Sequence, residues 1–218
     1  MKYKLVIFDL DGTILDTLED LKQALNHALA FYEYPTRTLD EVRCFVGNGI
    51  RRLIERAMPE NVLDTDIDKV FTEFNKYYAL HCADYTKPYE GVVGLIKKLR
   101  NMGIKTAVVS NKADYGVQEL CDKYFNKLFD YAVGEREGVN RKPSPDAVYE
   151  VLSHLNIEKN DAVYIGDSEV DVKTAQNAGL DSIMVSWGFR DKEYLYEQGA
   201  VHIADDCDTL EAMIIGRV

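Results

Sequence analysis

The stretch Lys4-Leu5-Val6-Ile7-Phe8-Asp9-Leu10-Asp11-Gly12-Thr13 joins a short apolar run directly to two carboxylates. The run Lys4–Phe8 is typical of a strand that is buried on both faces of a parallel sheet. Ligands of such sheets bind beyond the carboxyl ends of the strands, so Asp9 and Asp11 are expected to face a site. Alternation puts both carboxylates on one side of the chain, where their repulsion favours a bound cation or a shared proton. The other interpretation is a turn that the two acids cap beside Gly12.

Further apolar runs alternate with segments of helical spacing. Predicted strands lie at 105–109, 162–165 and 182–185, with weaker candidates at 129–133 and 201–204. Between them, apolar residues recur at helical spacing, as in Val92, Leu95, Ile96 and Leu99. Strands that alternate with helices predict an α/β fold, a Rossmann-like core of three layers around a parallel sheet.

The segment 16–85 differs, because it shows helical periodicity repeatedly and no convincing strand. Seventy residues exceed any ordinary connection between neighbouring strands. They are therefore interpreted as an inserted, all-helical cap domain at 16–85, within a core domain formed by 1–15 and 86–218. The alternative is a single domain with one long helical crossover.

Three more segments with polar or charged side chains lie next to predicted strands and helices. Ser110 and Asn111 come after the strand at 105–109, where a helix N-terminus favours anions. Lys142 is followed by a proline, which restricts the backbone beside the ammonium group. Asp167 ends the strand at 162–165, and Asp171 follows on the first turn of the next helix. Singly, each could be a helix cap or a solvated turn; together they indicate one polar site.

In order and spacing, these four segments resemble the four motifs of the haloacid dehalogenase superfamily. The resemblance covers Lys4 to about Val185, and it covers the cap only by position. It implies that Asp9 is a nucleophile that attacks phosphorus. It also implies that Asp11 is a general acid, which protonates the leaving oxygen and later activates water. Dehalogenases of the family lack an acid at this second position, so phosphoryl transfer is expected.

The same resemblance implies a Mg²⁺ cofactor and a phosphate site. Mg²⁺, a hard ion, suits oxygen ligands better than zinc does. The implied metal ligands are the Asp9 carboxylate, the Asp11 backbone carbonyl and Asp167, with Asp171 in a direct or supporting position. The implied phosphate-binding residues are Thr13, Ser110, Asn111 and Lys142, with Thr13 orienting the loop beside Asp11.

The cap sequence bears on the substrate. Gly47, Asn48, Gly49 and Arg51 lie in a segment similar to one in phosphoglycolate phosphatases. A Gly-Asn-Gly turn that opens a helix offers N–H groups to an anion, and Arg51 adds positive charge. The alternative is an ordinary turn beside a solvated arginine.

The predicted function is therefore a phosphoric monoester hydrolase of the phosphoglycolate phosphatase type, which works through an aspartyl-phosphate intermediate. The alternatives are a pyrophosphatase, a nucleotide or sugar phosphatase of the same subfamily, or a β-phosphoglucomutase-like phosphomutase. A receiver domain also combines an acidic pocket with magnesium, but it carries its phosphorylated Asp in a mid-chain strand and lacks the second acid.

Composition limits the possible partners. A net charge of −11 disfavours binding to polymeric nucleic acid. No stretch reaches the roughly 20 apolar residues that a membrane-spanning helix needs, and the N-terminal apolar run is too short for a signal peptide. The four cysteines form no C-x-x-C pair, which indicates neither a zinc site nor a disulfide framework. A cytoplasmic monomer or homodimer that acts on a small phosphorylated metabolite is expected, without contact to a membrane.

Overall fold

The computed structural model describes residues 2–216 and divides into two compact units. One unit comprises the residues up to Leu15 and those from Pro88 onward. The other comprises Asp16–Lys87. The second unit thus interrupts the first in sequence, shortly after the acidic loop that follows the first strand.

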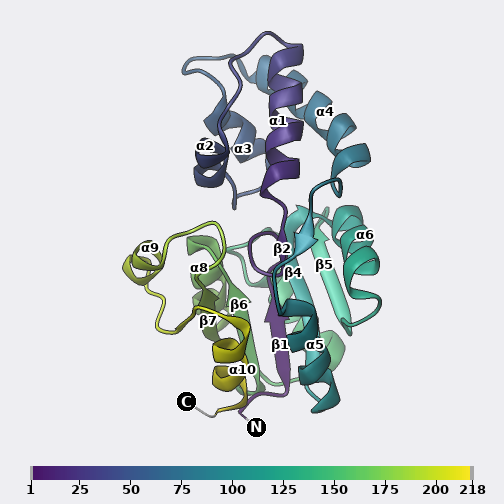
Figure 1. The fold of residues 1–218 in the computed structure, drawn as a ribbon, viewed down its shortest axis with the longest axis vertical. Helices are drawn as coiled ribbons and strands as arrows, with labels where there is room; N and C mark the ends of the chain where they lie inside the picture. The colour runs from purple at the N-terminus through teal and green to yellow at the C-terminus, as the bar shows by residue number, and fades with distance from the viewer. Residues whose placement is uncertain (1, 217–218) are drawn as a thin grey trace. The chain divides into compact units, whose positions relative to one another are not determined.

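A parallel sheet forms the centre of the larger unit (Figure 1). Its strands are β1 (Leu5–Phe8), β4 (Lys105–Ala113), β5 (Tyr131–Glu135), β6 (Ala162–Gly166), β7 (Asp181–Val185) and β8 (Ile203–Ala204). Within residues 2–216 these six strands follow the order β5-β4-β1-β6-β7-β8, and every neighbouring pair is parallel. Strand β1 is fully buried, as its unbroken apolar sequence predicts for a central strand. It pairs with β4 on one side and β6 on the other, so the ends of these three strands lie together.

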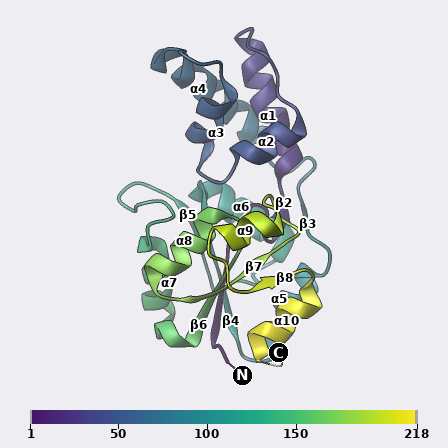
Figure 2. The ribbon, with the colours of Figure 1, turned by 90° about the vertical axis from the view of Figure 1, so that its left-hand side faces the viewer.

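Helices cover both faces of this sheet. They are α5 (Val92–Asn101), α6 (Asp114–Phe125), α7 (Asp146–Leu155), α8 (Glu169–Ala178), α9 (Lys192–Glu197) and α10 (Cys207–Ile215), with a 3-10 turn, η1 (Lys159–Asp161). Figure 2 shows α7 and α8 on one side of the strands, and α5 and α10 on the other. Leu5 and Ile7 of β1 pack in one apolar cluster with Val148 and Val151 of α7. The predicted three-layer α/β core is therefore confirmed.

The inserted unit is helical, as predicted. Its helices are α1 (Leu18–Phe31), α2 (Leu39–Phe45), α3 (Ile50–Ala57) and α4 (Asp64–His81). Two short strands, β2 (Leu15–Asp16) and β3 (Lys87–Pro88), pair where the chain leaves and re-enters the core. Helix α2 begins at a capping box, in which the Thr38 and Glu41 side chains each bond the other residue's backbone N–H. No helix among the described residues has both the length and the apolarity needed to cross a membrane.

A buried carboxylate closes the helical unit. Asp20 in α1 is 2% exposed, and it accepts hydrogen bonds from the N–H groups of Tyr85 (3.0 Å) and Thr86 (2.7 Å). The Thr86 hydroxyl donates to the same carboxylate at 2.7 Å. These bonds tie the first turns of α1 to the segment that follows α4, so the two ends of the insertion are held together.

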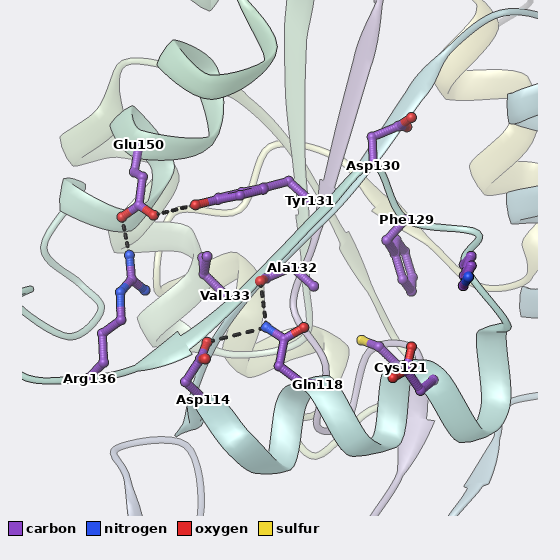
Figure 3. A pocket seen from close by; sticks show the side chains of 12 residues that line it. Asp114, Gln118, Cys121, Phe129, Asp130, Tyr131, Ala132, Val133, Arg136 and Glu150 are labelled. Carbon is purple, nitrogen blue, oxygen red and sulfur yellow. Dashed lines mark hydrogen bonds and ion pairs between the residues drawn. The ribbon is translucent and has the colours of Figure 1, made fainter.

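Backbone groups of β5, a strand at the edge of the sheet, form hydrogen bonds with side chains. The Ala132 carbonyl accepts from Gln118 Nε2 (2.8 Å), and the Gly134 N–H donates to Asp114 Oδ1 (2.8 Å). Arg136 donates to the Gly134 carbonyl at 3.2 Å. Figure 3 shows Asp114 and Gln118 reaching from α6 toward this strand, beside a hollow of about 450 Å³. None of the predicted site residues lines that hollow.

Candidate active site

The loop after β1 is a tight turn around one carbonyl. The Leu10 carbonyl accepts hydrogen bonds from the N–H groups of Ile14 (3.1 Å) and Leu15 (3.0 Å). Gly12 has a φ of 86°, in the region that favours glycine. Asp9 itself is 8% exposed, and its N–H donates to the Ile165 carbonyl of β6. The turn thus fixes Asp9 at the carboxyl edge of the sheet, as predicted from the parallel strands.

Lys142 joins two of the predicted acids. Its ammonium group lies 2.9 Å from Asp9 Oδ1 and 2.8 Å from Asp171 Oδ1, and its side chain is only 3% exposed. The hydroxyl of Tyr164 accepts from the same ammonium at 3.0 Å and donates to Asp171 at 3.1 Å. Burial lowers the pKa of Lys142, but the Asp171 and Asp9 carboxylates outweigh it and hold that pKa well above its usual value. Lys142 therefore carries a permanent positive charge in the site.

Asp171 is completely buried, and both of its oxygens already have donors. Besides Lys142 and Tyr164, it accepts from the Ser168 hydroxyl (2.6 Å) and from the N–H groups of Ser168 (3.1 Å) and Asp167 (3.3 Å). Gly166 permits this arrangement, since an added Cβ would lie 2.3 Å from the Asp171 Cβ. A carboxylate with so many donors holds its neighbours in place and has little capacity left for a further ligand.

Asp167 follows β6 and lies against the turn after β1. Its Oδ1 accepts from the Thr13 hydroxyl at 2.9 Å, and its Oδ2 accepts from the Phe189 N–H at 2.8 Å. Gly12 is again required, because an added Cβ would lie 2.3 Å from Asp167 Oδ2. Burial raises the pKa of Asp167 to about 7, and neighbouring Asp171 adds to the rise. The Phe189 N–H and the Thr13 hydroxyl act in the opposite direction.

Three carboxylates meet at this point. One carboxylate oxygen from each of Asp9, Asp167 and Asp171 lies within 4.8 Å of the other two, and all three residues are buried. Burial raises the pKa of Asp9 well above its usual value; Asp171 and Asp167 add to this effect, and Lys142 opposes it. A buried group of like charges of this kind is destabilised unless a cation or protons neutralise it. An all-oxygen donor set fits a hard divalent cation.

Strand β4 continues four residues beyond the predicted end at Val109, so Ser110, Asn111 and Lys112 lie within it and are buried. Asn111 bonds the Lys142 backbone twice: its Oδ1 accepts from the Lys142 N–H (2.8 Å), and its Nδ2 donates to the Lys142 carbonyl (3.1 Å). The Asn111 side chain therefore positions the lysine segment. Ser110 Oγ accepts from the Lys112 N–H at 3.2 Å.

Asp11 lies on the more exposed side of the loop. Its side chain is 20% exposed, and its Oδ1 lies 3.1 Å from the ammonium group of Lys112, which is 4% exposed. The Asp11 carboxylate is thus not one of the three that converge on the possible metal position. A contribution from its backbone carbonyl stays a prediction.

The predicted substrate residues of the helical unit form the connection between α2 and α3. Gly47 and Gly49 have φ values of 111° and 81°, and Gly49 precedes the first turn of α3. Arg51 is paired with Asp68 at 2.6 Å and with Glu55 at 3.4 Å. Its guanidinium group already has carboxylate partners within the unit. Docking of a substrate anion at Gly47, Asn48, Gly49 and Arg51 stays a prediction.

Comparison with known protein families shows which family the chain belongs to. The family model described as a haloacid dehalogenase-like hydrolase matches residues 6–185. The chain is a haloacid dehalogenase-like hydrolase. The resemblance drawn from the four motifs is therefore confirmed, and so is the prediction that the protein is an enzyme of this superfamily.

The hydrolase belongs to the phosphoglycolate phosphatase-like branch. It is 32% identical over 209 residues to a phosphoglycolate phosphatase of Pseudomonas syringae pv. tomato, a match that covers 93% of this chain and 76% of the relative. A crystal structure of a candidate phosphoglycolate phosphatase from Lactobacillus delbrueckii subsp. bulgaricus is 39% identical, with a TM-score of 0.94 over 98% of this chain and 99% of the other. CbbY of Rhodobacter sphaeroides, crystallised with phosphate, is 25% identical, with a TM-score of 0.75 over 94% and 95% of the two chains.

Sequence reasoning missed several residues of the hydrolase that contact the site. Lys112 was visible beside Ser110 and Asn111, but no local signal tied it to Asp11. Tyr164 was predicted only as part of a strand, where an aromatic residue is ordinary. The segment Trp187–Phe189 follows β7 and carries no acid or base, so nothing in its sequence indicated a contact with Asp167.

Proposed function

We propose that this hydrolase is a Mg²⁺-dependent phosphatase that cleaves a small phosphomonoester of the phosphoglycolate type, with Asp9 as the nucleophile. The observation that carries the proposal is the position of Asp9. One of its oxygens accepts from the Leu10 N–H (2.7 Å) and pairs with Lys142 (2.9 Å), beside the buried carboxylates Asp167 and Asp171. The other oxygen has no hydrogen-bond donor among residues 2–216, and so it can meet an incoming phosphorus atom.

In the first step, the free oxygen of Asp9 attacks phosphorus, and the bond from phosphorus to the leaving-group oxygen breaks. Asp11 gives its proton to that oxygen, so the product leaves as a neutral alcohol. Lys142, held by Asp171 and Tyr164, keeps one oxygen of Asp9 in place and offsets negative charge on the phosphoryl group.

In the second step, water attacks phosphorus and the bond to Asp9 breaks, which releases inorganic phosphate. The Asp11 carboxylate, left ionised by the first step, accepts the proton of the attacking water and returns to its starting state. Lys112 lies 3.1 Å from Asp11 and can stabilise its ionised form between the two steps. Ser110, which follows Val109 in β4, would donate its hydroxyl to a phosphoryl oxygen.

Mg²⁺ would be held by Asp9 and Asp167, with Asp171 in support through its bonds to Lys142 and to the Asp167 N–H. When bound, it would supply positive charge against the nucleophile and the phosphoryl oxygens. The raised pKa values of Asp9 and Asp167 support a requirement for such a cation. The donor set of oxygens alone supports magnesium over zinc.

The phosphoglycolate class is supported by the Pseudomonas syringae relative at 32% identity, which bears that name. Phosphate bound to Rhodobacter CbbY supports a phosphorylated ligand. Pyrophosphate, a nucleotide or a sugar phosphate would need the same nucleophile and the same metal, so only a comparison of substrates separates these candidates.

The test is release of inorganic phosphate from 2-phosphoglycolate, pyrophosphate, nucleoside monophosphates and sugar phosphates, with and without Mg²⁺. We expect Mg²⁺-dependent release, highest with 2-phosphoglycolate, and its loss by at least about 10³-fold in Asp9→Asn, because the amide lacks the nucleophilic charge. Asp130→Asn is the matched control, since this carboxylate pairs with Arg100 near the edge of the sheet and has no proposed part in the reaction. Equal activity of Asp9→Asn and wild type would refute the proposed nucleophile.

A further inference from the structure

A turn after β7, defined here as the β7 turn (Trp187–Phe189), contacts the loop after β1 and the acid after β6. The Trp187 indole N–H donates to the Thr13 carbonyl at 3.0 Å. The Phe189 N–H donates to Asp167 Oδ2 at 2.8 Å, while the Thr13 hydroxyl donates to Asp167 Oδ1 at 2.9 Å. Trp187, Thr13, Asp167 and Phe189 thus form a closed set of contacts, in which each oxygen of Asp167 has one donor.

Gly188, between the two donors, is packed directly against this set. An added Cβ would lie 2.3 Å from the Asp167 Cβ, 2.5 Å from its Oδ2 and 2.5 Å from the Gly12 carbonyl. Gly188 is not among the glycines with a positive φ, so its conflict is with neighbouring atoms and not with its own backbone conformation. The turn can reach Asp167 only because this residue has no side chain.

The end of the β7 turn is also anchored. Arg190, the next residue, pairs with Glu169 in the first turn of α8 at 2.9 Å, and both side chains are largely buried. Asp167 precedes this first turn in sequence, and Asp171 lies within it. The turn is therefore held at Thr13 on one side and at α8 on the other, so its Phe189 N–H has little freedom to move away from Asp167.

From these contacts we infer that the β7 turn is a positioning element for the metal site. It fixes the rotation of the Asp167 carboxylate, so that the lone pairs not used by Thr13 and Phe189 face Asp9. Carboxylates that bind metals hold their ions better when hydrogen bonds orient them in advance. Trp187 holds Thr13, whose hydroxyl in turn donates to Asp167. Gly188 has no side chain, and so it lets the turn approach Asp167 closely. The inference rests on the proposed metal-dependent function, but it concerns the binding of the ion itself.

Two substitutions test the turn. Trp187→Phe keeps an aromatic ring and removes the indole N–H, and Gly188→Ala inserts the conflicting Cβ. We expect the dissociation constant for Mn²⁺, used as the probe and followed by the electron paramagnetic resonance signal of the free ion, to rise at least about tenfold in each variant without substrate. Trp187 is the only tryptophan of the chain, so its fluorescence gives a second readout for wild type and for Gly188→Ala.

Matched controls separate this role from a general loss of packing. Gly94→Ala places a Cβ in α5 with nothing within 4 Å, and Tyr196→Phe changes an exposed aromatic residue. Both are expected to bind Mn²⁺ as wild type does. The melting temperature without metal shows whether each variant is folded; if Gly188→Ala is not, Trp187→Phe carries the test.

The outcomes are distinct from those for the phosphatase proposal. Weaker Mn²⁺ binding in the β7 turn variants supports the inference even if no substrate of the panel releases phosphate. Weaker activity with unchanged Mn²⁺ affinity overturns it, because the turn would then act on some other step. Equal weakening in Gly94→Ala also overturns it.

Discussion

The chemistry of the site depends on which oxygen each buried group contacts. Tyr164 is fully buried, and its hydroxyl lies between Lys142 (3.0 Å) and Asp171 (3.1 Å). Burial raises the pKa of this phenol well above its usual value, so the hydroxyl remains a neutral donor. It keeps the ammonium group of Lys142 against Asp9, where the proposed mechanism needs a charge.

Tyr164→Phe removes this hydroxyl without changing the packing of the ring. We expect kcat to fall roughly tenfold with little change in KM, because Lys142 loses one of its contacts and is held less firmly against the nucleophile. The free energy of unfolding should fall by about 1–2 kcal/mol. Steady-state kinetics and denaturant unfolding measure the two effects.

Tyr131→Phe is the control for that experiment, since its hydroxyl also donates to a carboxylate, Glu150, at 2.7 Å but near the β5 edge. It should lose some stability and keep its kcat. A Tyr164→Phe variant with the kcat of wild type would show that Lys142 does not need the hydroxyl.

At the scale of single elements, β5 is an edge strand of the sheet, with one side not paired to another strand of the described chain. An edge strand with free N–H and C=O groups is a template for another chain. Here Gln118 and Asp114 of α6 occupy the Ala132 carbonyl and the Gly134 N–H, as Figure 3 shows for Gln118. Both acceptor and donor are thus satisfied within the chain.

The double substitution Asp114→Ala/Gln118→Ala would free these two backbone groups. We expect the free energy of unfolding to fall by about 1–3 kcal/mol, and self-association to increase with protein concentration. Denaturant unfolding and light scattering are the measurements. Glu119→Ala, an exposed position on the same helix, should change neither. If the double variant scatters light as wild type does at every concentration, the side chains do not protect this edge.

For the molecule as a whole, the acid cluster is expected to make stability depend on pH and on a bound cation. The pKa of Asp167 is about 7 in the folded protein and near 3.8 when unfolded, so the folded state binds this proton more tightly. Its contribution to stability is therefore greatest below pH 4, declines between about pH 4 and 7, and stays low above pH 7. We expect a divalent cation that binds the ionised cluster to restore stability above pH 7.

Asp167→Asn removes this titration and keeps the shape of the side chain. Without metal, we expect the variant to melt at a higher temperature than wild type at pH 8, and at a similar temperature near pH 4. Addition of Mg²⁺ at pH 8 should raise the melting temperature of wild type only. Thermal unfolding at both pH values, with Mg²⁺ or with a chelator, measures these differences. An equal Mg²⁺ effect on both proteins would place the ion elsewhere.

Local sequence signals determined much of this molecule. Apolar runs that end in acids predicted β1 and β6 with Asp9 and Asp167 at their ends, because strand burial and side-chain alternation are properties of short segments. Helical periodicity over seventy residues predicted the insertion. The start of α2 was predictable in principle from Thr38 and Glu41, whereas the extension of β4 was not, because polar residues at 110–112 continue a strand only when a site buries them.

Tertiary structure alone decided how the acids are held. Tyr164 beside Lys142, Lys112 beside Asp11, and the β7 turn beside Asp167 bring together residues that are 22 to 101 positions apart. Their contacts depend on the order of β4, β1, β6 and β7 in the sheet, which no short segment encodes. The sequence by itself determined which chemical groups reach the carboxyl edge of the sheet. Packing between distant strands then decided which group each of them contacts, because hydrogen bonds require atoms to approach within about 3 Å.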